Sequence, residues 1–163
     1  MEKSERPLRV LVAEALGWTD CKVAEYPRPT AIPDDHWPTW HGHPSVGTWP
    51  WWMQDAHEQT EKARPAVPHY ELEWQTTGPL IEKYHIGLVY SQSEPAETNP
   101  NDWCAFQWPK GEWTQFPGDD EEGPAELAGP LVLDGSAPDA ATGATPLLAV
   151  CALILKLKEA GKL

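Results

Sequence analysis

The pattern of apolar and polar positions predicts a first helix over Leu8–Leu16. Apolar side chains recur there at the spacing of one helical face, formed by Leu8, Leu11, Val12, Ala15 and Leu16. Pro7 suits the first position of a helix, and Gly17 can supply its C-terminal cap. Glu5 and Arg9 are spaced as an ion pair that would support the same helix.

Another helix is expected near the other end of the sequence, over Pro146–Lys158. Thr145 offers a capping hydroxyl, and Pro146 suits the first turn. Residues 147–155 are apolar on every side, which indicates a helix that is buried all round or shared with a partner subunit. We therefore expect buried side chains at Leu147, Val150, Cys151 and Ile154. We also expect the Trp-rich loop or another subunit to cover Leu148, Leu153 or Leu155.

The region between these helices predicts a small antiparallel sheet and one more helix. Alternating or β-branched residues favour strands at Ile86–Tyr90, Trp103–Trp108 and Trp113–Phe116. Upstream, Tyr70–Tyr84 has a helical face, and Pro79 either follows a start near Thr77 or kinks the helix; the face consists of Trp74, Leu80, Ile81 and Tyr84. The fold class is thus α/β, of the α+β kind, with a sheet of about three strands flanked by helices.

A Trp/Pro-rich segment is the most informative part of the sequence. Residues 34–53 hold five of the ten tryptophans, three of the six histidines and three of the 18 prolines, so we expect no ordinary helix or strand there. The wider stretch 18–69 carries eight prolines and should form short pieces, with a helical turn around Met53–Ala63. Its tryptophans either cap a small core or bind something.

Length and composition predict one domain over residues 1–163, with residues 18–69 as a Trp/Pro-rich insertion and residues 118–144 as an acidic, Gly/Pro/Ala-rich loop. The net charge of −13 argues against binding to duplex nucleic acid or to an anionic membrane, although one Arg and a helix N-terminus could still bind a small anion.

The three cysteines are too few and too scattered for a disulfide framework. With no signal-peptide pattern and no apolar run long enough to cross a bilayer, we expect a soluble cytoplasmic protein.

Candidate chemistry in the sequence is weak. His41 and His43 could share a zinc ion, with further ligands from Asp34, Asp35, His36 or His57, but polar loop histidines are the favoured interpretation. A Cys104–His85 pair has no informative spacing. The acids at Asp119–Glu122 lack the spacing of a calcium loop. We therefore expect no enzyme, no metal site and no cofactor.

Three separated segments resemble a known family. They are Leu16-Gly17-Trp18 after the first helix, the stretch Trp74–Leu88 (WQTTGPLIEKYHIGL), and the stretch Ala144–Leu153 (ATPLLAVCAL). Together they look like the bacteriophage "ABA sandwich" family and related small phage proteins of unknown function. The resemblance implies a small sheet flanked by helices and a phage or prophage origin, hence the cytoplasm of a bacterial host. It carries no catalytic residue, and the long insertion over 18–69 departs from the family pattern.

Two functions are expected from these observations. The first is a non-enzymatic phage protein that binds or sequesters a small nucleotide-like ligand, by analogy with phage proteins that counteract host defence. Its site would consist of Trp37, Trp40, Trp49, Trp51, Trp52, Arg28, Arg64 and Thr145. The alternative is an acidic protein–protein interaction or inhibitor module, which binds a host protein or forms a homo-oligomer.

Overall fold

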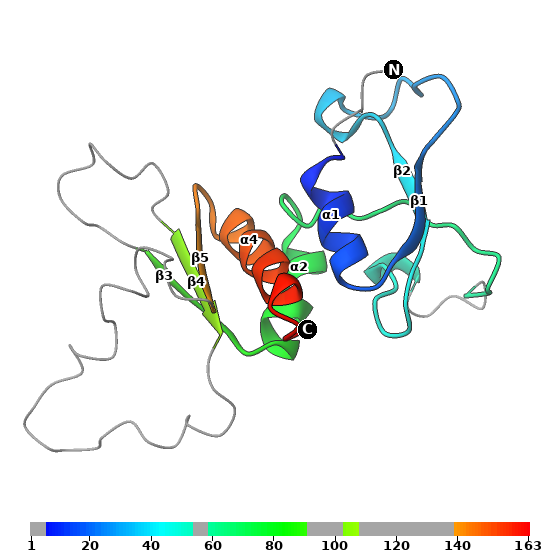
Figure 1. Ribbon diagram of the computed structural model, residues 1–163. Coiled ribbons are helices and arrows are strands. Elements are labelled where there is room, and N and C mark those ends of the chain that lie inside the picture. Colours follow the sequence, from blue (N-terminus) through cyan, green and yellow to red (C-terminus); the bar gives the residue numbers. More distant parts are fainter. Residues whose placement is uncertain (1–5, 54–58, 91–102, 108–138) are drawn as a thin grey trace, which may run out of the picture. The chain divides into compact units, whose positions relative to one another are not determined.

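The computed structural model describes residues 6–53, 59–90, 103–107 and 139–163 (Figure 1). Where the sequence predicts a single domain, the chain divides into two compact units, Met1–Thr76 and Thr77–Leu163. The fold is α+β, with three helices and two small antiparallel sheets among the described residues, so the expected fold class is confirmed.

The second unit contains a three-stranded antiparallel sheet in the order β3-β4-β5. Strands β3 (Ile86–Tyr90) and β4 (Trp103–Gln107) match two expected strands. The third strand is β5 (Ala140–Gly143), which pairs with β4 and lies in the segment expected to be an acidic loop. The loop prediction is therefore wrong at residues 140–143. No strand signal is present in the sequence there, because alanine and glycine have low β propensity and the pairing partner β4 is distant in the sequence. The expected strand Trp113–Phe116 lies outside the described residues.

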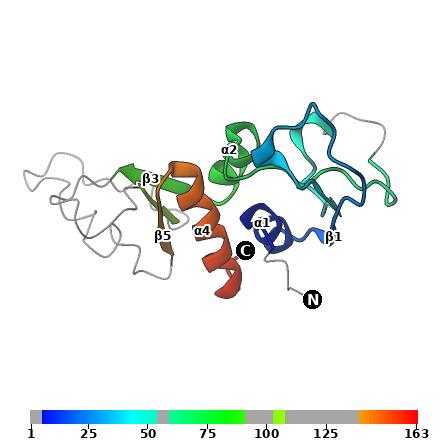
Figure 2. The same ribbon diagram turned by 90° about the horizontal axis from the view of Figure 1, so that it is seen from above.

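Helix α4 (Pro146–Glu159) lies against strands β4 and β5 of this sheet (Figures 1 and 2). Its start is as expected: Thr145 Oγ1 accepts a hydrogen bond from the Leu148 N–H at 3.2 Å, and Pro146 follows the cap. The four expected core residues, Leu147, Val150, Cys151 and Ile154, are at most 5% exposed. Leu153 is also fully buried, whereas Leu148 and Leu155 are half-buried. What covers these three leucines stays a prediction.

Close approach of α4 to β5 depends on a glycine. A Cβ atom on Gly143 would lie 2.4 Å from the backbone nitrogen of Ala149. Small residues at 140–143 therefore let the helix backbone pack directly on the strand, which explains why this strand carries no large side chain.

Helix α2 (Trp74–Lys83) begins before Thr77 and includes Pro79, so the expected helix is present with an earlier start. Of its expected apolar face only Leu80 is buried; Ile81 and Tyr84 are half-buried and Trp74 is 53% exposed. The boundary between the two units falls within this helix.

In the first unit, helix α1 (Leu8–Ala15) has Leu16 as its C-cap. Gly17 follows the cap, as expected, with a φ of +95° that suits glycine. Its buried side differs from the expected stripe. Leu11 is 39% exposed, whereas Val10 and Ala13 are fully buried and Arg9 is only 6% exposed. Glu5, the expected partner of Arg9, lies outside the described residues.

The Trp/Pro-rich segment contains short pieces, as expected, but one of them is an ordinary strand. Strand β1 (Thr19–Val23) pairs antiparallel with β2 (Trp40–His43). Two 3-10 turns are also present: η1 (Asp34–His36) follows Pro33, and η2 (Trp51–Met53) follows Pro50. The expectation that residues 34–53 hold no strand is therefore wrong. The reason lies at Gly42, where a Cβ atom would come within 2.7 Å of Cys21 Sγ, so the lack of a side chain lets the two strands meet.

The chain after the second 3-10 turn returns alongside β2. The Val67 N–H donates to Trp40 O at 2.7 Å, and the Gly42 N–H donates to Pro65 O at 3.2 Å. Of the helical turn expected over Met53–Ala63, residues 54–58 lie outside the described part, and residues 59–63 contain a turn rather than a helix.

Gly143→Ala should destabilise the protein, since its methyl group would collide with the α4 backbone. We expect a loss of about 1–3 kcal/mol, the usual cost of overpacking. Gly78→Ala is the matched control, because Gly78 is in α2 and its Cβ would meet nothing within 4 Å. That variant should be neutral or gain about 0.5–1 kcal/mol through helix propensity. Urea unfolding followed by circular dichroism measures both; equal stabilities would contradict the close packing of α4 on β5.

Candidate ligand-binding site

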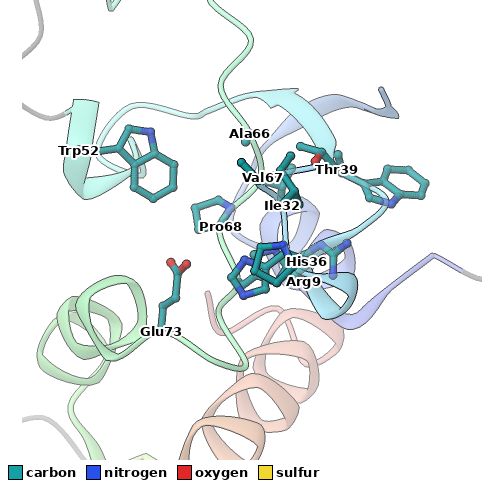
Figure 3. Close-up of a pocket in the computed structure, with 13 residues that line it drawn as sticks. Arg9, Ile32, His36, Thr39, Trp52, Ala66, Val67, Pro68 and Glu73 are labelled. Carbon is teal, nitrogen blue, oxygen red and sulfur yellow. The ribbon is translucent and has the colours of Figure 1, made fainter. Parts of the chain in front are cut away.

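A pocket of about 230 Å³ lies within the first unit (Figure 3). We call it the Arg9 pocket. Helix α1, the segment 31–40, the turn η2 and the segment 66–73 all contribute to it. Its lining consists of Arg9, Ala31, Ile32, Pro33, His36, Thr39, Trp40, Trp52, Ala66, Val67, Pro68, His69 and Glu73. A mostly apolar wall with a few polar groups is typical of a small-molecule site.

Arg9 joins three of the four chain segments that form the pocket, namely α1, 31–40 and 66–73. Its Nη2 donates a hydrogen bond of 2.7 Å to the carbonyl of Pro38, and its Nη1 lies 3.7 Å from Glu71 Oε1. The guanidinium is thus buried with one neutral and one charged acceptor beside it. Burying a charge costs several kcal/mol unless it is paired in this way, so the three segments are fixed around it.

Glu71 lies between two cationic or potentially cationic groups. Its Oε1 is 3.6 Å from His69 Nδ1 and 3.7 Å from Arg9 Nη1, which are electrostatic contacts rather than short hydrogen bonds. Burial alone would raise the pKa of Glu71, but His69 and Arg9 outweigh it and hold the pKa below the usual 4.5. The carboxylate is therefore ionised and balances the buried Arg9.

Aromatic rings form much of the pocket wall. His36, in η1, stacks on His69 with ring centroids 4.1 Å apart and planes at 21°. Trp40 of β2 is 9% exposed, whereas Trp52 of η2 keeps 43% of its surface exposed. Trp40 Nε1 and His69 Nδ1 are buried without a hydrogen-bond partner in the described part of the chain. A buried donor or acceptor without a hydrogen bond lowers the free energy of unfolding, because its lost hydrogen bonds to water are not replaced.

Glu73 adds a second carboxylate to the pocket. Its Oε2 accepts a hydrogen bond of 3.0 Å from Thr76 Oγ1. In Figure 3 its side chain extends toward Trp52 and Pro68. Thr76 thus orients a half-buried carboxylate at the aromatic side of the pocket.

Of the five tryptophans expected to form the site, two line the Arg9 pocket. Trp40 and Trp52 do so, and the other three are in edge contacts with neighbouring rings. Trp37 is 5.9 Å from Tyr26, Trp49 is 6.4 Å from His43, and Trp51 is 5.7 Å from Trp52, measured between ring centroids. The segment thus uses some of its tryptophans for packing and presents others to the pocket.

The three other expected site residues do not line this pocket. Arg28 donates two hydrogen bonds to Ile32 O and forms an ion pair with Asp34. Arg64 donates to the carbonyls of Glu61 and Ala63 and lies 3.7 Å from Asp20 Oδ2. Thr145 caps α4 in the second unit.

The candidate metal ligands have structural contacts. His41 Nδ1 lies 3.0 Å from Arg64 O and its Nε2 lies 3.3 Å from Tyr26 Oη, while His43 Nδ1 lies 3.2 Å from Ala63 O. Both rings thus attach the returning chain to β2. Within the described residues no three His, Cys, Asp or Glu side chains are grouped to hold a metal ion. His57 and the acids at Asp119–Glu122 lie outside those residues.

Cys104, considered above as a nucleophile with His85, and Cys21 are both buried. Cys104 is fully buried in β4, and His85 is exposed at the end of α2. At Cys21, burial and the nearby Glu14 carboxylate raise the pKa of the thiol to about 11, which disfavours the reactive thiolate.

Sequence reasoning missed three polar residues of the pocket, Arg9, His69 and Glu73, and also Glu71, which lies beside Arg9. One signal was present: Arg9 lies among apolar residues, between Leu8 and Val10. A charged side chain that is buried with apolar neighbours needs a partner of opposite charge. The partner itself, Glu71, is far away in the sequence, and no local pattern identifies it.

No family model, curated protein or solved structure matches this chain. The resemblance to the phage "ABA sandwich" family therefore stays a prediction from three sequence segments. Among the described residues, no helix has the length and apolar character needed to cross a membrane.

Arg9→Met should destabilise the first unit, because it leaves the Pro38 carbonyl and the Glu71 carboxylate buried without their partner. We expect a loss of about 3–5 kcal/mol, as for removal of one member of a buried ion pair. The double variant Arg9→Met/Glu71→Gln should recover part of that loss. Urea unfolding of the four proteins in this cycle measures the coupling, and additive single effects would show that the two groups act independently.

The lowered pKa of Glu71 predicts an acid-sensitive contribution to stability. A carboxyl group with a folded-state pKa below 4.5 stabilises the fold above that pH, and this contribution is lost as the pH falls through the folded pKa. The stability difference between the wild type and Glu71→Gln should therefore shrink on acidification below pH 4.5. A difference that stays constant across this range would contradict the assigned role of the carboxylate.

Proposed function

We propose that this protein is a non-enzymatic binding protein that captures a small planar ligand of nucleobase-like size in the Arg9 pocket. The observation that carries the proposal is a 230 Å³ cavity whose lining includes a buried and paired guanidinium and two tryptophans. A planar ring suits this lining, because aromatic side chains bind bases and similar rings by stacking.

The pocket is preformed, which favours binding. The contacts of Arg9 with Pro38 and Glu71 join α1 to both loop segments before a ligand arrives. Prolines at 33, 38 and 68 restrict the same segments further. A ligand would then meet ordered walls, so less of the binding free energy is lost to ordering the protein.

The ionisable groups of the pocket have structural contacts that can orient a ligand. Arg9 is held by Pro38 and Glu71, Glu73 is held by Thr76, and His36 and His69 stack on each other. A ligand would therefore meet side chains that already have a defined position.

The resemblance to phage proteins extends this proposal. A phage- or prophage-encoded protein that sequesters a nucleotide-like molecule in the bacterial cytoplasm would counteract host defence without catalysis. This biological role depends on the resemblance alone, and the ligand pocket does not require it.

A protein–protein interaction module is the second candidate. It is favoured by aromatic and aliphatic side chains that remain exposed in the first unit, including Val46 at 100%, Trp51 at 48% and Tyr26 at 43%, together with the net charge of −13. A basic protein partner would match that charge. Such a partner would alter the emission of Trp51, whereas a small ligand should act through Trp52.

Trp52→Ala should weaken ligand binding, because it removes the exposed ring of the pocket wall. Titration of tryptophan fluorescence with nucleobases, nucleosides and nucleotides identifies a ligand, and loss of one stacking ring should lower its affinity by roughly 5- to 150-fold, as expected for about 1–3 kcal/mol. Trp74→Ala is the matched control, since Trp74 is 53% exposed and does not line the pocket. Equal losses in both variants, or a panel without any binder, would contradict the proposal.

A further inference from the structure

We propose that the Arg9 pocket selects a planar group that presents two N–H donors, of the amidine or guanine-edge kind, to the carboxylate of Glu73. The inference rests on the proposed function, because it specifies the ligand chemistry of the same pocket. It differs from the sequence expectation of a site that includes Arg28, Arg64 and Thr145.

The charges around the pocket do not favour an anion. Arg9 already lies beside Glu71, and its Nη2 is used by Pro38 O. Its positive charge is therefore balanced before a ligand enters. A phosphate or carboxylate in the pocket would also meet the Glu73 carboxylate, and bringing a second negative charge beside a half-buried one is costly.

The two arginines expected in the ligand-binding site have partners elsewhere. Arg28 is paired with Asp34, and Arg64 lies beside Asp20. Neither lines the pocket. In the described part of the chain, Glu73 has no Lys, Arg or His partner at ion-pair distance, so its charge is available to a ligand with hydrogen-bond donors.

The geometry of Glu73 suits a planar donor pair. A carboxylate accepts two parallel N–H bonds from one flat group, and such charge-assisted pairs are among the stronger hydrogen bonds in proteins. Figure 3 shows the Glu73 side chain extending toward Trp52, so a flat group bound to the carboxylate could lie near the indole ring. A cationic donor group would gain further from the face of a tryptophan.

Three isosteric probes test the inference on the full-length protein. Benzamidine carries the donor pair with a positive charge, benzamide is neutral with an amide donor, and benzoate is an anion of the same shape. Isothermal titration calorimetry should give benzamidine an affinity at least about tenfold above that of benzoate, with benzamide between them. Guanosine should likewise bind more tightly than inosine, which lacks the 2-amino donor.

Glu73→Gln should reduce the affinity for benzamidine by roughly tenfold or more and leave that for benzamide nearly unchanged. Glu82→Gln is the matched control, because Glu82 is an exposed glutamate of the same helix α2. Circular dichroism checks that both variants fold. The comparison of benzamidine with benzoate uses the wild type alone and holds even if Glu73→Gln is unstable.

Each contrary result has a distinct meaning. Tighter binding of benzoate than of benzamidine would overturn the inference and indicate an anion pocket. Equal affinities for all three probes, unchanged in Glu73→Gln, would overturn it while leaving an apolar ligand site as proposed above. If none of the three probes bound, the inference would also be overturned. The proposed function would then require that another planar compound binds the wild type and binds Trp52→Ala more weakly.

Discussion

The buried guanidinium of Arg9 is the contact on which the first unit depends. Its burial is offset by two partners: Arg9 Nη2 donates to Pro38 O at 2.7 Å, and Arg9 Nη1 lies 3.7 Å from Glu71 Oε1. One side chain thus fixes a helix near the start of the chain to two proline-containing segments. The pocket follows from this arrangement, since the three elements that Arg9 joins form most of its lining and Trp52 of η2 completes it.

The tryptophans of the Trp/Pro-rich segment divide into two roles through their burial. Trp40 belongs to a paired strand and is almost covered, and Trp37 and Trp49 are in edge contacts with other rings. Trp52 is different, because it lines the pocket and still exposes 43% of its surface. Packing and binding are therefore both uses of the same segment, and the exposed ring surface beside Glu73 connects the fold of this region to the proposed ligand.

The elements that could be predicted from sequence are those whose signals are local. Thr145, Pro146 and the apolar run after them define the start and the buried side of α4 within a few residues. Strand β5 could not be found in this way, because Ala140–Gly143 is favourable only when β4 lies beside it and α4 crosses closely above Gly143. The same limit applies to the site. The Trp-rich segment indicates binding by its composition, but the pairing of Arg9 with Glu71 arises only when distant parts of the chain meet.

The most direct test of this account is a two-dimensional ¹H–¹⁵N spectrum of the ten indole N–H groups, recorded during titration with benzamidine. Because a ligand in the Arg9 pocket contacts two of these rings, the resonances of Trp40 and Trp52 should shift together and saturate at one affinity. The resonance of Trp74, which does not line the pocket, should stay in place. Shifts confined to tryptophans outside the pocket, or none at saturating benzamidine, would contradict the account.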